Sequence, residues 1–199
     1  MWRSVRLRYT AMKVAIGFKS HSGWACVVVL ARDGRSHAIV ERGRIELVDA
    51  GNVWGKAPYH AAEGREPKVA ERIVADGIAK AHRVARREVA KLAQRMRESG
   101  HEIVGCGVIA GASMPDWTVA QILAVHVRMH LAEGFLFPHA LADAVTASAL
   151  ALTRVPKKEA EAEAATERIA ALGKGLGPPW GKDQKCAAAA AIRVLATDA

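Results

Sequence analysis

Aromatic residues are scarce in this sequence: they make up 5% of its 199 residues, whereas 51% are hydrophobic. The low aromatic share argues against an aromatic-rich stacking platform and favours small aliphatic side chains that pack helices on a sheet. No run of about 18 apolar residues occurs, and the first residues lack the apolar stretch of a secretory signal. We therefore expect a soluble cytoplasmic protein with no membrane partner.

Cysteine is also rare. Cys26, Cys106 and Cys186 stand far apart in the sequence, and none belongs to a Cys-x2-Cys pair. We therefore expect three reduced core residues.

Basic residues outnumber acidic ones. The chain holds 29 Lys and Arg against 20 Asp and Glu, which gives a formal net charge of +9. Clustered cations gain affinity for a polyanion by releasing its condensed counterions, which favours nucleic acid or a phosphorylated ligand as the partner. A well-solvated basic surface explains the same charge.

The sequence indicates a short tail followed by one domain. Residues 1–11 carry three arginines and no acid, so we interpret them as a basic N-terminal tail, and residues 12–199 form the single predicted domain. Short apolar segments rich in β-branched residues predict strands over 14–18, 24–30 and 37–48. Turn-forming residues join them, so three antiparallel strands open the domain.

Helices and strands alternate in the remainder of the chain. The predicted elements are a polar loop over 49–67, a helix over 68–99, a strand over 103–110, a helix from 118 to 131 that resumes to about 147, a strand over 150–155, a helix over 157–172, a Gly- and Pro-rich loop over 173–181 and a helix over 182–195. Thr118 and Gln121 match a capping box. The near-continuous apolarity of 103–110 indicates a strand covered on both faces.

This order of elements resembles the ribonuclease H-like fold, an α/β fold whose five-stranded mixed sheet has three antiparallel strands followed by two parallel ones, with flanking helices. Within that fold, segments 16–24, 128–134 and 178–187 resemble parts of the RuvC-type Holliday-junction resolvases. The first is similar to the opening strand of that family, the second to a helical segment, and the third to its Gly-rich loop and following helix. The resemblance implies nucleic-acid binding and a divalent metal cofactor.

The sequence departs from this family where the chemistry is located. Nucleases of this fold gather several carboxylates around two divalent cations. Lys19 stands where their first acid is expected, and no acid follows the strand over 103–110 before Asp116. Only Asp183 fits the pattern, which argues against a standard two-metal nuclease and leaves at most a variant hydrolase.

Three other residues are candidates for catalysis and metal binding. His126, His130 and Glu133 stand at i, i+4 and i+7 and therefore share one helix face. The apolar stripe through Ile122 continues through these positions, which predicts that the three side chains point toward the sheet. We identify them as candidate metal ligands and, with Asp183, as candidate catalytic residues. Neutral histidines that hydrogen-bond to the backbone or to Glu133 are the alternative.

Several loops supply candidate ligand-binding residues. Their mixtures of cations, hydroxyls, imidazoles and turn formers suit a phosphate site, and equally suit ordinary turns and packing. The candidates are Lys19, Ser20, His21 and Ser22 in the opening turn, Ser113 and Asp116 after the strand over 103–110, His60 in the polar loop, and Trp180, Lys182 and Lys185 near the carboxyl end. We expect these segments to form one cleft together with His126 and His130.

The long helix over 68–99 is strongly basic. Its arginines Arg83, Arg86 and Arg87 are candidate nucleic-acid contacts, and a solvated helix face is the alternative. Together these features predict a RuvC-like protein that binds nucleic acid or a phosphorylated ligand. A metal- or His-dependent hydrolase of a small substrate is one alternative. A catalytically silent interaction module, which could be a homodimer, is the other.

Overall fold

The structure is a computed structural model that describes residues 11–34, 36–111 and 113–197. Apart from Ala11, the proposed basic tail lies outside the described residues. The strands are β1 (Lys13–His21), β2 (Trp24–Asp33), β3 (Ser36–Glu46), β4 (Glu102–Ala110) and β5 (Leu152–Pro156). The helices are η1 (Val53–Lys56), α1 (Pro58–Ala62), α2 (Pro67–Glu98), α3 (Val119–Leu123), α4 (His126–Ala147), α5 (Lys157–Ala164), α6 (Glu167–Leu172) and α7 (Lys182–Thr197). In this part of the chain we find no helix with the length and apolarity needed to cross a membrane.

The strands form one mixed sheet in the order β3-β2-β1-β4-β5. β1 pairs with β2 and β2 with β3 in antiparallel fashion, whereas β4 and β5 run parallel to β1. Gly23 allows the tight turn between β1 and β2 because its φ of 85° lies in the left-handed region. The predicted α/β fold, with three antiparallel strands followed by two parallel ones, is confirmed.

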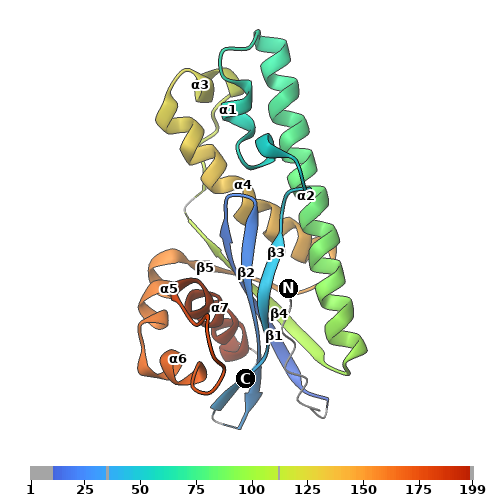
Figure 1. Cartoon of the computed structure of the whole chain (residues 1–199), viewed down its shortest axis with the longest axis vertical. Coiled ribbons are helices and arrows are strands. Elements are labelled where there is room, and N and C mark those ends of the chain that lie inside the picture. The colour runs from blue at the N-terminus through green and yellow to red at the C-terminus, as the bar shows by residue number, and fades with distance from the viewer. Residues whose placement is uncertain (1–10, 35, 112, 198–199) are drawn as a thin grey trace.

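Helices cover both faces of the sheet (Figure 1). On one face α7 lies directly on the strands, because these present glycines to it: a Cβ at Gly17 would lie 1.8 Å from the carbonyl oxygen of Ala187, and one at Gly107 would lie 2.4 Å from that of Ala190. On the other face α2 and α4 pack over β1 and β4 and bury Phe18 among other core residues. Gly and Ala at facing positions therefore explain how α7 approaches the sheet so closely.

The amino-terminal halves of α2 and α4 extend beyond the sheet, and α1 and α3 pack on them (Figure 1). We call this part the helical projection. It has an apolar cluster of its own, separate from the clusters that cover the sheet. Its buried members are Tyr59, Ala62, Ala70, Val74, Ile122, Met129 and Ala132.

Three boundaries differ from the sequence predictions. The polar loop over 49–67 contains η1 and α1, and Pro58 opens α1 at a position where its missing N–H costs nothing. The helix predicted over 157–172 is divided into α5 and α6, because Thr166 adopts an extended backbone and caps α6. The capping box of Thr118 and Gln121 is confirmed, but α3 ends at Leu123 and α4 restarts after Val125, whose backbone is extended.

Candidate metal centre

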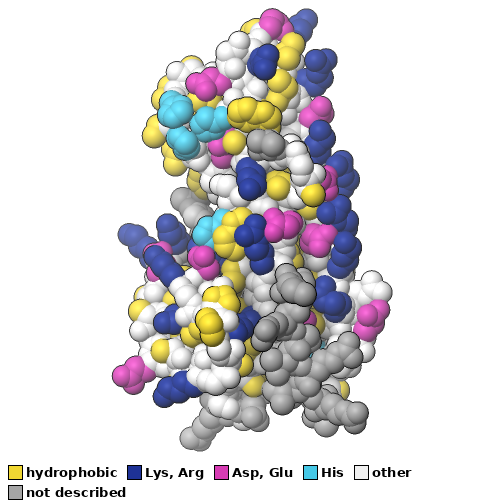
Figure 2. All heavy atoms as spheres, viewed as in Figure 1, with side chains coloured by type: hydrophobic (Ala, Val, Ile, Leu, Met, Phe, Trp, Pro, Cys, Tyr) yellow, Lys and Arg dark blue, Asp and Glu magenta, His cyan; other side chains and the backbone are white. Residues whose placement is uncertain are grey.

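Three histidines from two distant segments meet on the helical projection. His60 lies on α1, and His126 and His130 lie one turn apart on α4. One ligand atom of each imidazole lies within 4.8 Å of those of the other two, and the Nε2 atoms of His126 and His130 are 3.0 Å apart. We call these residues the three-histidine cluster; Figure 2 shows histidines gathered on the surface of the projection beside hydrophobic side chains.

A buried carboxylate holds the first of these histidines. Glu133 Oε2 lies 2.8 Å from Nδ1 of His60, and Oε1 accepts hydrogen bonds from the backbone N–H groups of Tyr59 and His60, both at 3.2 Å. Glu133 is only 7% exposed, so these donors compensate for the loss of water around its charge. Because Nδ1 faces the carboxylate, Nε2 is the nitrogen of His60 that remains for a ligand.

The environment also keeps the phenol of Tyr59 neutral. Burial, and next the Glu133 carboxylate, raise the pKa of Tyr59. The buried ring packs in the apolar cluster of the projection, so Tyr59 supports α1 rather than supplying a nucleophile.

The predicted orientation of these three side chains toward the sheet is wrong. His126 and His130 are exposed, and Glu133 is buried but faces α1, where its carboxylate contacts His60. α4 buries Met129 and Ala132 in the same apolar cluster as Ile122, whereas His126 is the first residue of α4, directly after the extended Val125, and lies outside this cluster together with His130. The opening turn lies at the end of the β1–β2 hairpin that faces the projection, where a Cβ at Gly23 would lie 2.7 Å from the side chain of Lys56, and among the described residues no hydrogen bond or ion pair joins this turn to the three histidines (Figure 1).

A repeated motif marks two of the histidines. Residues 60–64 read His-Ala-Ala-Glu-Gly and residues 130–134 read His-Leu-Ala-Glu-Gly. The glutamate of the second copy, Glu133, binds the histidine of the first, His60. His60 was predicted as a ligand-binding residue, but comparison of these two segments is the sequence signal that would have linked it to His130.

The donor set suits a transition-metal ion. Imidazole is a common ligand of Zn²⁺, which is held at about 2.0–2.1 Å from nitrogen in tetrahedral geometry, so nitrogens around one ion lie about 3.3 Å apart. The 3.0 Å between the Nε2 atoms of His126 and His130 is close to that separation. Three histidines would leave one coordination position for water or a ligand.

The end of β1 forms a separate polar cluster and does not fit two magnesium ions. Lys19 stands near the end of β1, and its Nζ donates to the backbone carbonyl of Ser20. Asp183 at the start of α7 faces His21 across 3.0 Å, and His21 stacks on Trp24 with ring centroids 4.3 Å apart. The second carboxylate near Lys19 is that of Glu161, which is paired with Lys182, so cations and an imidazole rather than two divalent ions balance the acids at this end of β1.

The remaining loop candidates are dispersed. Trp180 packs on Gly173, and its Nε1 donates to the carbonyl of Ile169 at 3.1 Å, which makes it a packing residue of the Gly-rich loop. Lys182 pairs with Glu161 at 2.8 Å. Within the described ranges, no hydrogen bond or ion pair links Ser22, Ser113, Asp116 or Lys185 to the three-histidine cluster. The segment 113–117 nevertheless lies against the projection, because Met114 and Trp117 pack on its apolar cluster and the guanidinium of Arg128 lies 4.8 Å from the centroid of the Trp117 ring.

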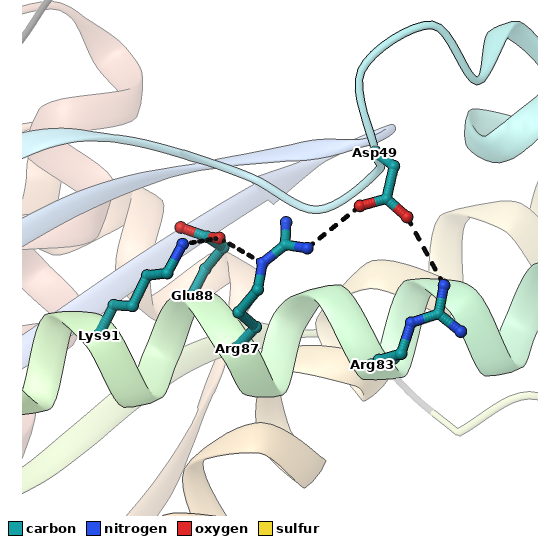
Figure 3. A network of polar contacts seen from close by, with 5 residues as sticks. All are labelled: Asp49, Arg83, Arg87, Glu88 and Lys91. Carbon is teal, nitrogen blue, oxygen red and sulfur yellow. Dashed lines mark hydrogen bonds and ion pairs between the residues drawn. The ribbon is translucent and has the colours of Figure 1, made fainter.

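The basic face of α2 is largely paired with acids. Asp49 lies 3.2 Å from Arg87 and 3.6 Å from Arg83, and Arg87 also contacts Glu88 at 2.8 Å (Figure 3). Arg86 binds Asp143 at 2.7 Å, and this hydrogen bond lowers the pKa of Asp143. All three candidate arginines are therefore exposed but partly neutralised.

Comparison with known proteins gives similarity of structure only. No protein family matches the sequence, and no curated protein does. Thermus thermophilus RuvC in complex with a Holliday junction substrate is 10% identical, with a TM-score of 0.49 over 93% of this chain and 96% of that chain. A second Thermus thermophilus RuvC structure gives 10% identity and a TM-score of 0.48 over the same shares. Neither likeness indicates what this chain binds.

Proposed function

We propose that this protein binds one divalent transition-metal ion, with zinc as the best candidate, through His60, His126 and His130. The observation that carries the proposal is the convergence of the three imidazoles around a point that Glu133 supports from the buried side. A pair of histidines one turn apart on a helix surface is unremarkable by itself. A third histidine, brought from another helix and fixed by a buried carboxylate, is the arrangement of many metal-bound histidines.

A metal ion at this point would supply a Lewis acid and an acidified water molecule. The residues of this chain then have distinct roles: the three histidines hold the ion, and Glu133 orients His60 and strengthens it as a ligand. His126 and His130 are exposed, so the open coordination position is accessible to a ligand from solution. An accessible position on a bound metal ion supports hydrolysis of a small substrate, which we propose as the activity of this site.

Metal analysis of the purified full-length chain tests the proposal. We expect about one zinc ion per chain by mass spectrometry, and zinc uptake by calorimetry after chelation. His60→Ala and the His126→Ala/His130→Ala double variant should lose this binding. His139→Ala is the matched control, because His139 lies on the same helix and is exposed. Unchanged zinc binding in both cluster variants, or none in the parent protein, would overturn the proposal.

The hydrolytic part has its own test. We expect the zinc-loaded protein to hydrolyse a p-nitrophenyl ester or phosphate faster than the chelated protein and faster than His60→Ala. If the protein binds one zinc ion per chain but shows no such turnover, the proposed hydrolytic activity is refuted and the proposed metal site stands.

Nucleic-acid binding is the second candidate. Lys and Arg side chains follow α2 along one edge of the molecule (Figure 2), and the chain carries a net charge of +9. Filter binding of linear and branched DNA and RNA across a salt series tests it, because phosphate contacts give affinity that falls steeply with salt. Negligible binding even at low salt would exclude this candidate.

A further inference from the structure

A depression adjoins the three-histidine cluster on the side of His60. It has a volume of about 550 Å³ and is lined by Trp54, His60, Ala61, Glu63, Gly64, Arg65 and Ile73. We propose that this depression takes a nucleotide, with its base on Trp54 and its phosphate between Arg65 and the metal ion. The inference rests on the proposed metal site and names the ligand class of that site.

Trp54 supplies the surface for the base. It is 61% exposed, which is unusual for so large an apolar ring, and in the part of the chain described its side chain makes no hydrogen bond, ring-stacking or cation–π contact. The backbone around it is ordered, since the N–H of Ala57 donates to the Trp54 carbonyl in η1. An exposed indole on an ordered turn is a typical stacking partner for a nucleobase.

Arg65 supplies the anion contact. Its exposed guanidinium makes no ion pair or hydrogen bond with any described residue, whereas Arg83, Arg86 and Arg87 all bind acids. An unpaired guanidinium binds phosphate without first breaking an internal pair. Together with a metal ion at His60, it places two positive groups beside the same depression.

Glu63 opposes this attraction. Its exposed carboxylate is the only acidic side chain that lines the depression. Glu63→Gln removes this charge and should therefore increase the affinity for an anion. An uncharged apolar ligand would not respond in this direction.

The size of the depression limits the ligand to one nucleotide unit. Small-molecule sites generally occupy about 300–1,000 Å³, and a depression of about 550 Å³ falls in this range. The base must present a free face to Trp54, so a base stacked inside a duplex is excluded. A free mononucleotide and the terminal nucleotide of a single strand offer the same chemistry.

Calorimetry with the zinc-loaded full-length chain tests the inference, with adenosine 5′-monophosphate, adenosine and inorganic phosphate as probes. Adenosine 5′-monophosphate should bind at least tenfold more tightly than adenosine or inorganic phosphate. Trp54→Ala should weaken it about tenfold, as expected for loss of one base stack, and Trp54→Phe should restore most of the affinity. Arg65→Ala should weaken it similarly, and Glu63→Gln should strengthen it. Arg97→Ala, at an exposed position near the end of α2, is the control and should change nothing.

The outcomes separate this inference from the metal proposal. If the three histidines bind zinc but the protein does not bind the monophosphate, the nucleotide inference alone is overturned. The same follows if the affinity for the monophosphate is unchanged in Trp54→Ala and Arg65→Ala. Absence of zinc binding would overturn both. A single-stranded oligoadenylate with a 5′-phosphate that binds more tightly than the monophosphate identifies a strand end as the source, and equal or weaker binding identifies the free nucleotide.

Discussion

Glu133 and His60 lie 73 residues apart in the sequence and 2.8 Å apart in space, between Oε2 of the carboxylate and Nδ1 of the imidazole. The contact joins α4 to α1, and the other carboxylate oxygen binds the backbone of the same helix. One buried side chain thus fixes both the position of a short helix and the ring orientation of its histidine. Glu133 was predicted from the sequence as a metal ligand; we now propose that it positions one.

Glu133→Gln should lower the affinity for zinc about 10- to 100-fold, because the amide is a weaker acceptor and no longer fixes the ring of His60. It should also cost about 1–3 kcal/mol of unfolding free energy, since the buried amide cannot satisfy all the former donors. Zinc titration and thermal unfolding measure the two effects. Glu102→Gln, at an exposed position at the start of β4, should leave both unchanged. Zinc affinity equal to that of the parent in Glu133→Gln would show that the carboxylate is only structural.

Gly17→Ala should destabilise the protein by about 1–3 kcal/mol or more, because the added Cβ would lie 1.8 Å from a backbone oxygen of α7. Gly134→Ala is the matched control: nothing lies within 4 Å of the added Cβ, and Ala is favoured over Gly in a helix by about 0.5–1 kcal/mol. Chemical denaturation should therefore move the two midpoints in opposite directions. A Gly17→Ala variant as stable as the parent would show that α7 does not depend on glycine in β1.

The sheet could be predicted from the sequence because its signals are local. The β-branched segments, the turn at Gly23 and the apolar run of β4 each follow from a few neighbouring residues, and the strand order follows from chain direction and crossover handedness. The capping box of Thr118 and Gln121 is local in the same sense.

The site could be predicted only in part, because it depends on contacts between distant segments. His126 and His130 are neighbours on a helix and were identified together, but His60 reaches them only after α1 docks on α4. The exposure of His126 could not be predicted because Val125 takes an extended backbone and α4 begins only at His126, and no strong helix-breaking residue marks that position. Tertiary packing of the projection decides both points.

The three cysteines should be unreactive in the folded protein. Burial raises the pKa of Cys26 and of Cys106 to about 12, and it also raises that of Cys186. At pH 8 the reactive thiolate is therefore a very small fraction of each. We expect no reaction with a thiol reagent over minutes at pH 8, and reaction of all 3 thiols in guanidinium. Rapid labelling of one cysteine in the native protein would contradict the buried placement.

Asp49→Asn tests whether α2 binds polyanions. Asp49 is shared by Arg83 and Arg87, and all three side chains are at least 41% exposed, so the substitution should change stability by less than about 1 kcal/mol. It releases Arg83 and frees Nη1 of Arg87, which keeps its contact with Glu88, and it should raise the affinity for a short DNA duplex several-fold at low salt, with a steeper salt dependence. Glu163→Gln adds the same net charge but frees Arg168 elsewhere, near α6, and so controls for charge alone. Filter binding that strengthens equally in both variants would reveal a general charge effect, and the nucleic-acid role of α2 would then be refuted.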